Sequence, residues 1–152
     1  MLVETPYDGA DTTGRVRSVV LPNGKRFSWF VDPHFHPTRL VDIAFTGLPE
    51  QVVAGDTLRL TLRISNPYPY AIGVCGDRSL VMLWKHGRFR VEEFDTGEHF
   101  NIPAGDTITR EVRFVVPEQL SGAGFDAGFA LRRDGYTNWF NGKPLRTEVV
   151  AP

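Results

Sequence analysis

Two histidines bracketed by prolines form the pattern closest to a metal site. They stand in the segment Asp32-Pro33-His34-Phe35-His36-Pro37. Residues two apart share a face of an extended chain, so the imidazoles of His34 and His36 could bind one metal ion, with Asp32 as a third ligand. This pattern allows the hypothesis of a metal-dependent enzyme. The alternative is a pair of ordinary loop histidines.

A cluster of aromatic and amide side chains near the C-terminus could bind a sugar. It comprises Tyr136, Asn138, Trp139, Phe140 and Asn141. Aromatic faces stack on the apolar faces of sugar rings, and an amide both donates and accepts hydrogen bonds, which suits carbohydrate hydroxyls. We therefore expect these residues to bind a ligand. The alternative is that Trp139 or Phe140 caps one end of the fold and the asparagines shape a turn.

No nucleophile with a partnering base stands out elsewhere in the sequence. No serine lies in a Gly-x-Ser-x-Gly segment, no lysine has an obviously apolar setting, and the acidic residues are scattered over polar stretches. We therefore expect a protein that is not an enzyme and that needs no cofactor.

Composition narrows the class of protein and of partner. The chain has 152 residues, which fits one domain with a sizeable core. Its net charge is −1. We expect no nucleic-acid partner and no membrane insertion, because no basic field and no apolar run of about 20 residues is present. A single cysteine, Cys75, rules out an intrachain disulfide. The N-terminus lacks the apolar core of a secretory signal, which predicts a soluble cytoplasmic protein.

Alternation of apolar and polar residues predicts the elements that position these groups. From Thr57 to Ser65 every second residue is a leucine or isoleucine, which predicts a strand with one buried and one exposed face. Similar segments predict strands at 15–21, 26–31, 40–46, 79–85, 88–94, 107–116, 125–132, 136–140 and 145–150. Asn23-Gly24 predicts a hairpin turn, and Asn141-Gly142 is expected to join the last two strands.

About nine or ten short strands separated by turns are typical of an all-β sandwich or barrel. The glycines and prolines that such turns require are spread along the chain. We expect a two-sheet antiparallel sandwich. It would form a single domain over residues 15–152, preceded by an N-terminal arm at 1–14.

The predicted hairpin at 79–94 is apolar on both faces of its first strand. Met82 and Trp84 point one way, while Val81 and Leu83 point the other. Such a strand is either central and covered on both sides or part of an interface. Met82, Trp84 and Phe89 are therefore a candidate interface, with a partner protein or a second copy of the chain in a homo-oligomer.

The residues that open and close several strands resemble those of a known kind of module. They are Ala54-Gly55-Asp56-Thr57, Ser65-Asn66-Pro67, Pro103-Ala104-Gly105-Asp106-Thr107 and, later, Leu120, Gly124 and Phe125. Their order is similar to that of bacterial immunoglobulin-like sandwich modules, and among these to the glycan-binding domain of polysaccharide-export transporter ATPases. The resemblance covers residues 40–150 and implies an immunoglobulin-like fold. It assigns no binding residue, because its motifs are turns and strand ends.

The leading hypothesis is a non-catalytic accessory module that recognises a carbohydrate through aromatic loops. Assembly with a partner protein is the first alternative. A metal-dependent enzyme that uses His34 and His36 is the second.

Overall fold

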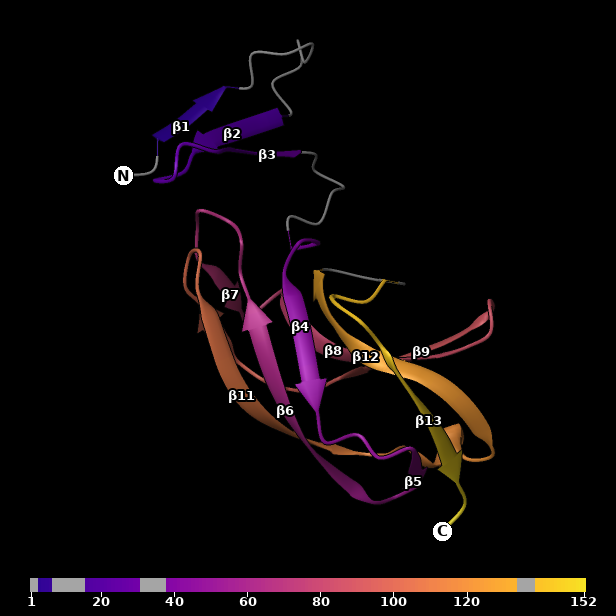
Figure 1. The fold of residues 1–152 in the computed structure, drawn as a ribbon. Helices are drawn as coiled ribbons and strands as arrows, with labels where there is room; N and C mark the ends of the chain where they lie inside the picture. The colour runs from indigo at the N-terminus through magenta and orange to yellow at the C-terminus, as the bar shows by residue number, and fades with distance from the viewer. Residues whose placement is uncertain (1–2, 7–15, 31–37, 134–138) are drawn as a thin grey trace. The chain divides into compact units, whose positions relative to one another are not determined.

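The computed structural model describes residues 3–6, 16–30, 38–133 and 139–152 (Figure 1). The chain forms two compact units, Met1–Arg39 and Leu40–Pro152. The expected division was an arm at 1–14 before a domain at 15–152, so the structure divides the chain at a different place.

The first unit contains a small antiparallel sheet. Its strands are β1 (Val3–Pro6), β2 (Val16–Val20) and β3 (Arg26–Phe30), in the order β1-β2-β3. The predicted Asn23-Gly24 hairpin is confirmed, since β2 pairs with β3 and Gly24 has a φ of 81° that glycine adopts without strain. β2 is thus the central strand, paired with β1 on one side and with β3 on the other.

The second unit is built from strands in three sheets. One sheet has the order β11-β6-β4, with β4 Asp42–Thr46, β6 Thr57–Ser65 and β11 Thr107–Val115. A five-stranded sheet has the order β5-β13-β12-β8-β9, with β5 Gln51–Val53, β8 Arg78–His86, β9 Arg90–Asp95, β12 Ala123–Arg133 and β13 Leu145–Val150. A ribbon pairs β7 (Ile72–Val74) with β10 (Phe100–Ile102). The described residues contain a single short 3₁₀ turn, η1 (Glu118–Leu120), and no α-helix, so the all-β prediction is confirmed.

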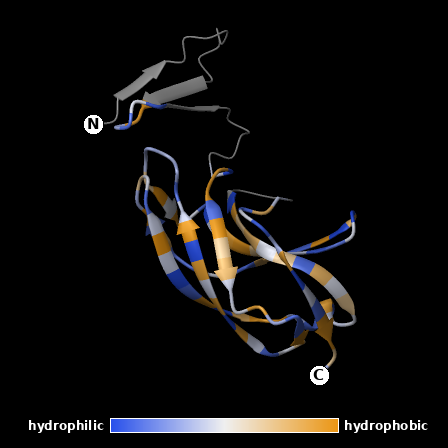
Figure 2. Ribbon diagram, in the orientation of Figure 1, coloured by the Kyte–Doolittle hydropathy of each residue, from blue (hydrophilic) through white to orange (hydrophobic). Residues whose placement is uncertain are grey.

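The β4–β6–β11 sheet and the five-stranded sheet pack through their apolar faces. The rings of Phe45 on β4 and Phe129 on β12 meet edge to face at 5.1 Å, and Trp84 on β8 stacks on Phe114 of β11 at 6.1 Å. Figure 2 shows hydrophobic and hydrophilic residues alternating along β6. The burial of β6 alternates in the same way, as its sequence predicts. This alternation leaves one face of the β4–β6–β11 sheet exposed.

The outer face of the five-stranded sheet carries a second, smaller apolar cluster. Val81, Leu83 and Ala130 are fully buried there, and Phe140 packs against them. Gly128 makes room for Phe140, because a Cβ at that glycine would lie 2.7 Å from a ring carbon. The apolar residues on both faces of β8 are therefore explained by a sheet that is covered on both sides.

The predicted hairpin between 136–140 and 145–150 does not form in the described residues. β13 pairs with β12 and, in parallel, with the short strand β5, which is not among the strands predicted from the sequence. Trp139 and Phe140 lie in a bend and an irregular segment. None of the described segments forms a helix with the length and apolar character needed to span a bilayer.

Candidate functional site

The predicted metal ligands His34 and His36 lie outside the described residues, as does Asp32. Within the residues that the structure does describe, no three His, Cys, Asp or Glu side chains come together to hold a metal ion.

The structure describes three of the five residues of the predicted aromatic–amide cluster, and these three differ in exposure. Tyr136 and Asn138 lie outside the described residues, while Trp139 and Phe140 are half-buried. Asn141 is only 1% exposed, so its amide is not available to a ligand. Its Nδ2 donates to the carbonyl of Val41 at 2.9 Å, and its Oδ1 accepts from the N–H of Leu131 at 2.8 Å. The expectation that Asn141 binds a ligand is therefore corrected to a structural role.

The three residues of the candidate interface on the β8–β9 hairpin also differ in exposure. Met82 and Trp84 are 0% exposed and belong to the core, so the expectation that they form an interface is corrected. Phe89 is 96% exposed in the turn between β8 and β9. The sequence could not separate them, because a strand covered on both sides and a strand at an interface have the same apolar pattern.

The base of this hairpin is fixed by several side-chain contacts. Arg90 Nε donates to Glu92 at 2.8 Å, and its NH2 group donates to the carbonyl of Gln119 at 2.9 Å. The Arg90 guanidinium also lies 5.1 Å from the ring centre of Phe125. Because these contacts join β9 to η1 and β12, the turn that carries Phe89 projects from a braced base.

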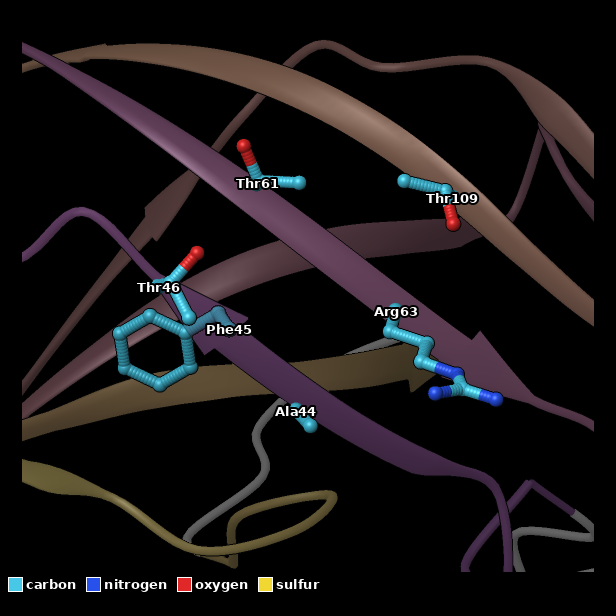
Figure 3. Close-up of a pocket in the computed structure, with 6 residues that line it drawn as sticks. All are labelled: Ala44, Phe45, Thr46, Thr61, Arg63 and Thr109. Atoms are coloured by element: carbon cyan, nitrogen blue, oxygen red, sulfur yellow. The ribbon is translucent and has the colours of Figure 1, made fainter.

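A hollow on the exposed face of the β4–β6–β11 sheet was not predicted from the sequence. It has a volume of about 320 Å³ (Figure 3). Its lining, called here the threonine hollow, consists of Ala44, Phe45, Thr46, Thr61, Arg63 and Thr109. All except Phe45 are exposed, and Phe45 packs its ring on Phe129 in the core. The alternation of apolar and polar residues predicted that this face of the sheet is exposed to solvent. It did not show which short side chains of neighbouring strands lie beside each other on that face.

The strand register explains why a hollow forms at this place. Arg63 on β6 lies opposite Ala44 on β4 and Thr109 on β11, and Thr61 lies opposite Thr46. Side chains opposite each other in a sheet are about 5 Å apart, so the short alanine and threonines leave space beside the long arginine. The hollow thus combines methyl groups, three hydroxyls and one guanidinium within one sheet face.

Two tyrosines at another part of the unit are shielded from water. The rings of Tyr68 and Tyr70 stack at 5.3 Å. Burial raises the pKa of Tyr68, and a hydrogen bond from the N–H of Leu40 to its hydroxyl partly opposes this. Burial also raises the pKa of Tyr70 to about 12, with Tyr68 adding to the shift and Arg78 reducing it. At neutral pH both hydroxyls are protonated, so they can donate hydrogen bonds but supply no base.

No family model and no curated protein matches this chain. Among the solved structures, it is similar to the Pseudomonas fluorescens alkylpurine DNA glycosylase AlkC bound to DNA containing an abasic site analog, at 11% identity and a TM-score of 0.45. The match covers 72% of this chain but only 30% of that one.

Proposed function

We propose that this chain is a non-catalytic carbohydrate-binding module with an immunoglobulin-like sandwich, and that the sugar binds at the threonine hollow. The observation that carries the proposal is the composition of the hollow, in which Thr46, Thr61, Thr109 and Arg63 surround a recess of about 320 Å³. The aromatic loop expected from the sequence is thereby replaced by a sheet face as the site.

The chemistry of the hollow complements a sugar ring. A sugar presents C–H groups on its faces and hydroxyls around its rim. Ala44 and the threonine methyl groups offer apolar contact, while the threonine hydroxyls donate and accept and Arg63 only donates. The strands fix the backbone under these short side chains, so little conformational entropy is lost on binding.

A glycan array tests this function directly. Thr61→Val keeps the shape of the side chain but removes its hydroxyl from the hollow. We expect the wild type to bind a saccharide and Thr61→Val to bind it roughly tenfold more weakly, as for one lost hydrogen bond of about 1.4 kcal/mol.

Thr57→Val is the matched control, because Thr57 is exposed on the same strand and face but does not line the hollow. Its binding should equal that of the wild type. Equal binding by wild type and Thr61→Val, or an array with no bound saccharide, contradicts the proposed site.

A second function is favoured by the position of Phe89. An aromatic ring that is 96% exposed on a braced hairpin is a typical anchor for a pocket on a partner protein. Arg88, Lys85 and His86 flank it, and the nearest acidic residue along the chain is Glu92, which pairs with Arg90. The partner that fits has an apolar pocket with an acidic rim.

The partner-binding function is tested by placing a photo-crosslinking amino acid at Phe89 and, as a control, at the exposed Val115 of β11. The expected result is one protein crosslinked through position 89 alone. That protein, once purified, should bind the wild type and lose binding to Phe89→Ala. Equal crosslinking from both positions, or undiminished binding by Phe89→Ala, argues against this function.

A further inference from the structure

Two arginines lie directly opposite each other on the sheet face that carries the threonine hollow. Arg59 of β6 pairs in register with Arg113 of β11, and both side chains are exposed. Like charges at directly opposed positions of a sheet destabilise it. Arg63 lies on the same face of β6, about 13 Å further along the strand.

These three guanidinium groups differ from other arginines of the unit. Arg90 and Arg132 each approach a carboxylate at 2.8 Å, and Arg110 approaches Glu98 at 3.6 Å. By contrast, no ion pair or side-chain hydrogen bond joins Arg59, Arg63 or Arg113 to any residue that the structure describes. Within the described part of the chain, these three charges therefore have no ion-pair partner.

Carboxylates interrupt this basic surface at two strand positions, Asp42 of β4, which lies opposite Ser65, and Glu111 of β11. Glu98 also lines a shallow hollow together with Glu111 and Arg113. Glu111 of β11 lies opposite Thr61, which places it diagonally between Arg59 and Arg63. It forms no ion pair within the described residues. The positive charge is thus concentrated at two points along β6, the Arg59–Arg113 pair and Arg63, separated by a position of opposite sign.

We infer that the ligand of this face is an acidic polysaccharide that lies along β6. One carboxylate or sulfate group binds between Arg59 and Arg113, a second binds Arg63, and the sugar ring between them occupies the threonine hollow. This inference rests on the proposed carbohydrate-binding function and specifies its ligand class. Guanidinium groups bind carboxylates and sulfates through paired N–H donors, and a bound anion removes the repulsion between the opposed arginines.

The same face is poorly suited to nucleic acid. Single-stranded nucleic acid binds where aromatic side chains stack on its bases, and the described residues of this face expose no aromatic ring beyond the 8% exposed Phe45. Recognition by hydroxyls and a few fixed cations favours a polymer that carries both hydroxyls and spaced anions.

The test is biolayer interferometry of the full chain against alginate, chondroitin sulfate and neutral dextran, with poly-dT and phosphatidylserine vesicles as other anionic surfaces. We expect one of the two acidic polysaccharides to bind more tightly than dextran, poly-dT and the vesicles. Arg59→Gln and Arg113→Gln should each weaken that binding roughly fivefold, whereas Glu111→Gln should strengthen it. Arg88→Gln, which changes an exposed arginine on the hairpin, should leave it unchanged.

A stability measurement shows whether these variants remain folded. Because each glutamine variant removes one member of a repelling pair, the melting temperatures of Arg59→Gln and Arg113→Gln should equal or exceed that of the wild type. Undiminished binding by both folded variants overturns the inference.

The failure of this inference can be told apart from failure of the proposed function. If a neutral glycan binds through Thr61 and the acidic polymers bind no better, the acidic ligand is wrong and the carbohydrate site stands. If poly-dT or vesicles bind as well as the acidic polysaccharides, the face is a general anion surface and the inference is overturned. If no saccharide binds, both the acidic ligand and the proposed carbohydrate-binding function are wrong.

Discussion

The side chain of Asn141 holds the backbone of Val41, a hundred residues earlier in the chain, through a hydrogen bond from its Nδ2 to the Val41 carbonyl at 2.9 Å. Two further hydrogen bonds reach β12, where its Oδ1 accepts from Leu131 and its backbone N–H donates to the carbonyl of Phe129, each at 2.8 Å. β13 pairs with β12 only as far as Ala127, so Asn141 satisfies backbone groups that the strand leaves unpaired. One residue thus links the edges of two sheets.

Replacing Asn141 should therefore destabilise the fold. Asn141→Ala leaves the carbonyl of Val41 and the N–H of Leu131 buried without their partner, which should lower the free energy of unfolding by about 2–4 kcal/mol. Urea denaturation measures this. Asn101→Ala, at an exposed position of β10, is the control and should change stability by less than about 0.5 kcal/mol. Similar values for the two variants would show that the Asn141 amide is not a structural clamp.

The neighbouring Gly142 should also resist substitution. Its φ is 111°, and an added Cβ would lie 2.5 Å from the carbonyl oxygen of Ile43. Gly142→Ala should then cost more than about 2 kcal/mol, because it combines backbone strain with a clash against backbone. Gly87→Ala makes the matched comparison: its φ is 64° and nothing lies within 4 Å of the added carbon. Thermal melts that rank Gly87→Ala as the more damaging change would contradict this account.

Stability should fall at high pH because of Tyr70. Its pKa is raised to about 12 in the folded chain, against an ordinary value near 10, so the unfolded chain loses the proton first. The stabilisation that comes from the raised pKa of Tyr70 is full below about pH 10 and is lost as the pH rises towards 12. Urea denaturation at pH 8 to 11.5 should show this decline, and Tyr70→Phe should reduce its slope. A slope unchanged in Tyr70→Phe would assign the decline to other groups.

Two phenylalanines should respond in opposite ways to truncation. Phe129 is 1% exposed and packs on Phe45, so Phe129→Ala should cost about 3–5 kcal/mol. Phe89→Ala should cost less than about 0.5 kcal/mol, because that ring contacts mostly solvent. Chemical denaturation of both variants tests the comparison. A large loss in Phe89→Ala would mean that its ring supports the fold and is not held free for a partner.

The sequence predicted the strands best where one face is buried and the other is exposed. From Thr57 to Ser65 the apolar period of two matches the observed burial residue by residue. The short strand β5 was missed because Gln51–Val53 is too brief to show a period and lies between Pro49 and Gly55. The boundary between the units was also missed, since a strand's sequence does not reveal which other strands it joins.

The candidate site was predicted least well, for a physical reason. The reading of Asn141 as a ligand-binding amide followed from its chemistry, but the same donor and acceptor serve a buried backbone equally well. The threonine hollow depends on which residues lie opposite Arg63, and this register joins strands that are distant in the sequence. The local sequence pattern predicts which face of β6 is exposed. The hollow in that face depends on how β4, β6 and β11 are paired.

The central claim is that a saccharide binds on the β4–β6–β11 sheet. Its most direct test is a ¹H–¹⁵N NMR titration of the chain with the saccharide that binds best on the array. We expect the amide signals of Ala44, Thr61 and Thr109 to shift together, while those of Phe89 and Asn141 stay in place. Shifts centred on Trp139 to Asn141 or on the β8–β9 turn would contradict it, as would a spectrum that does not change.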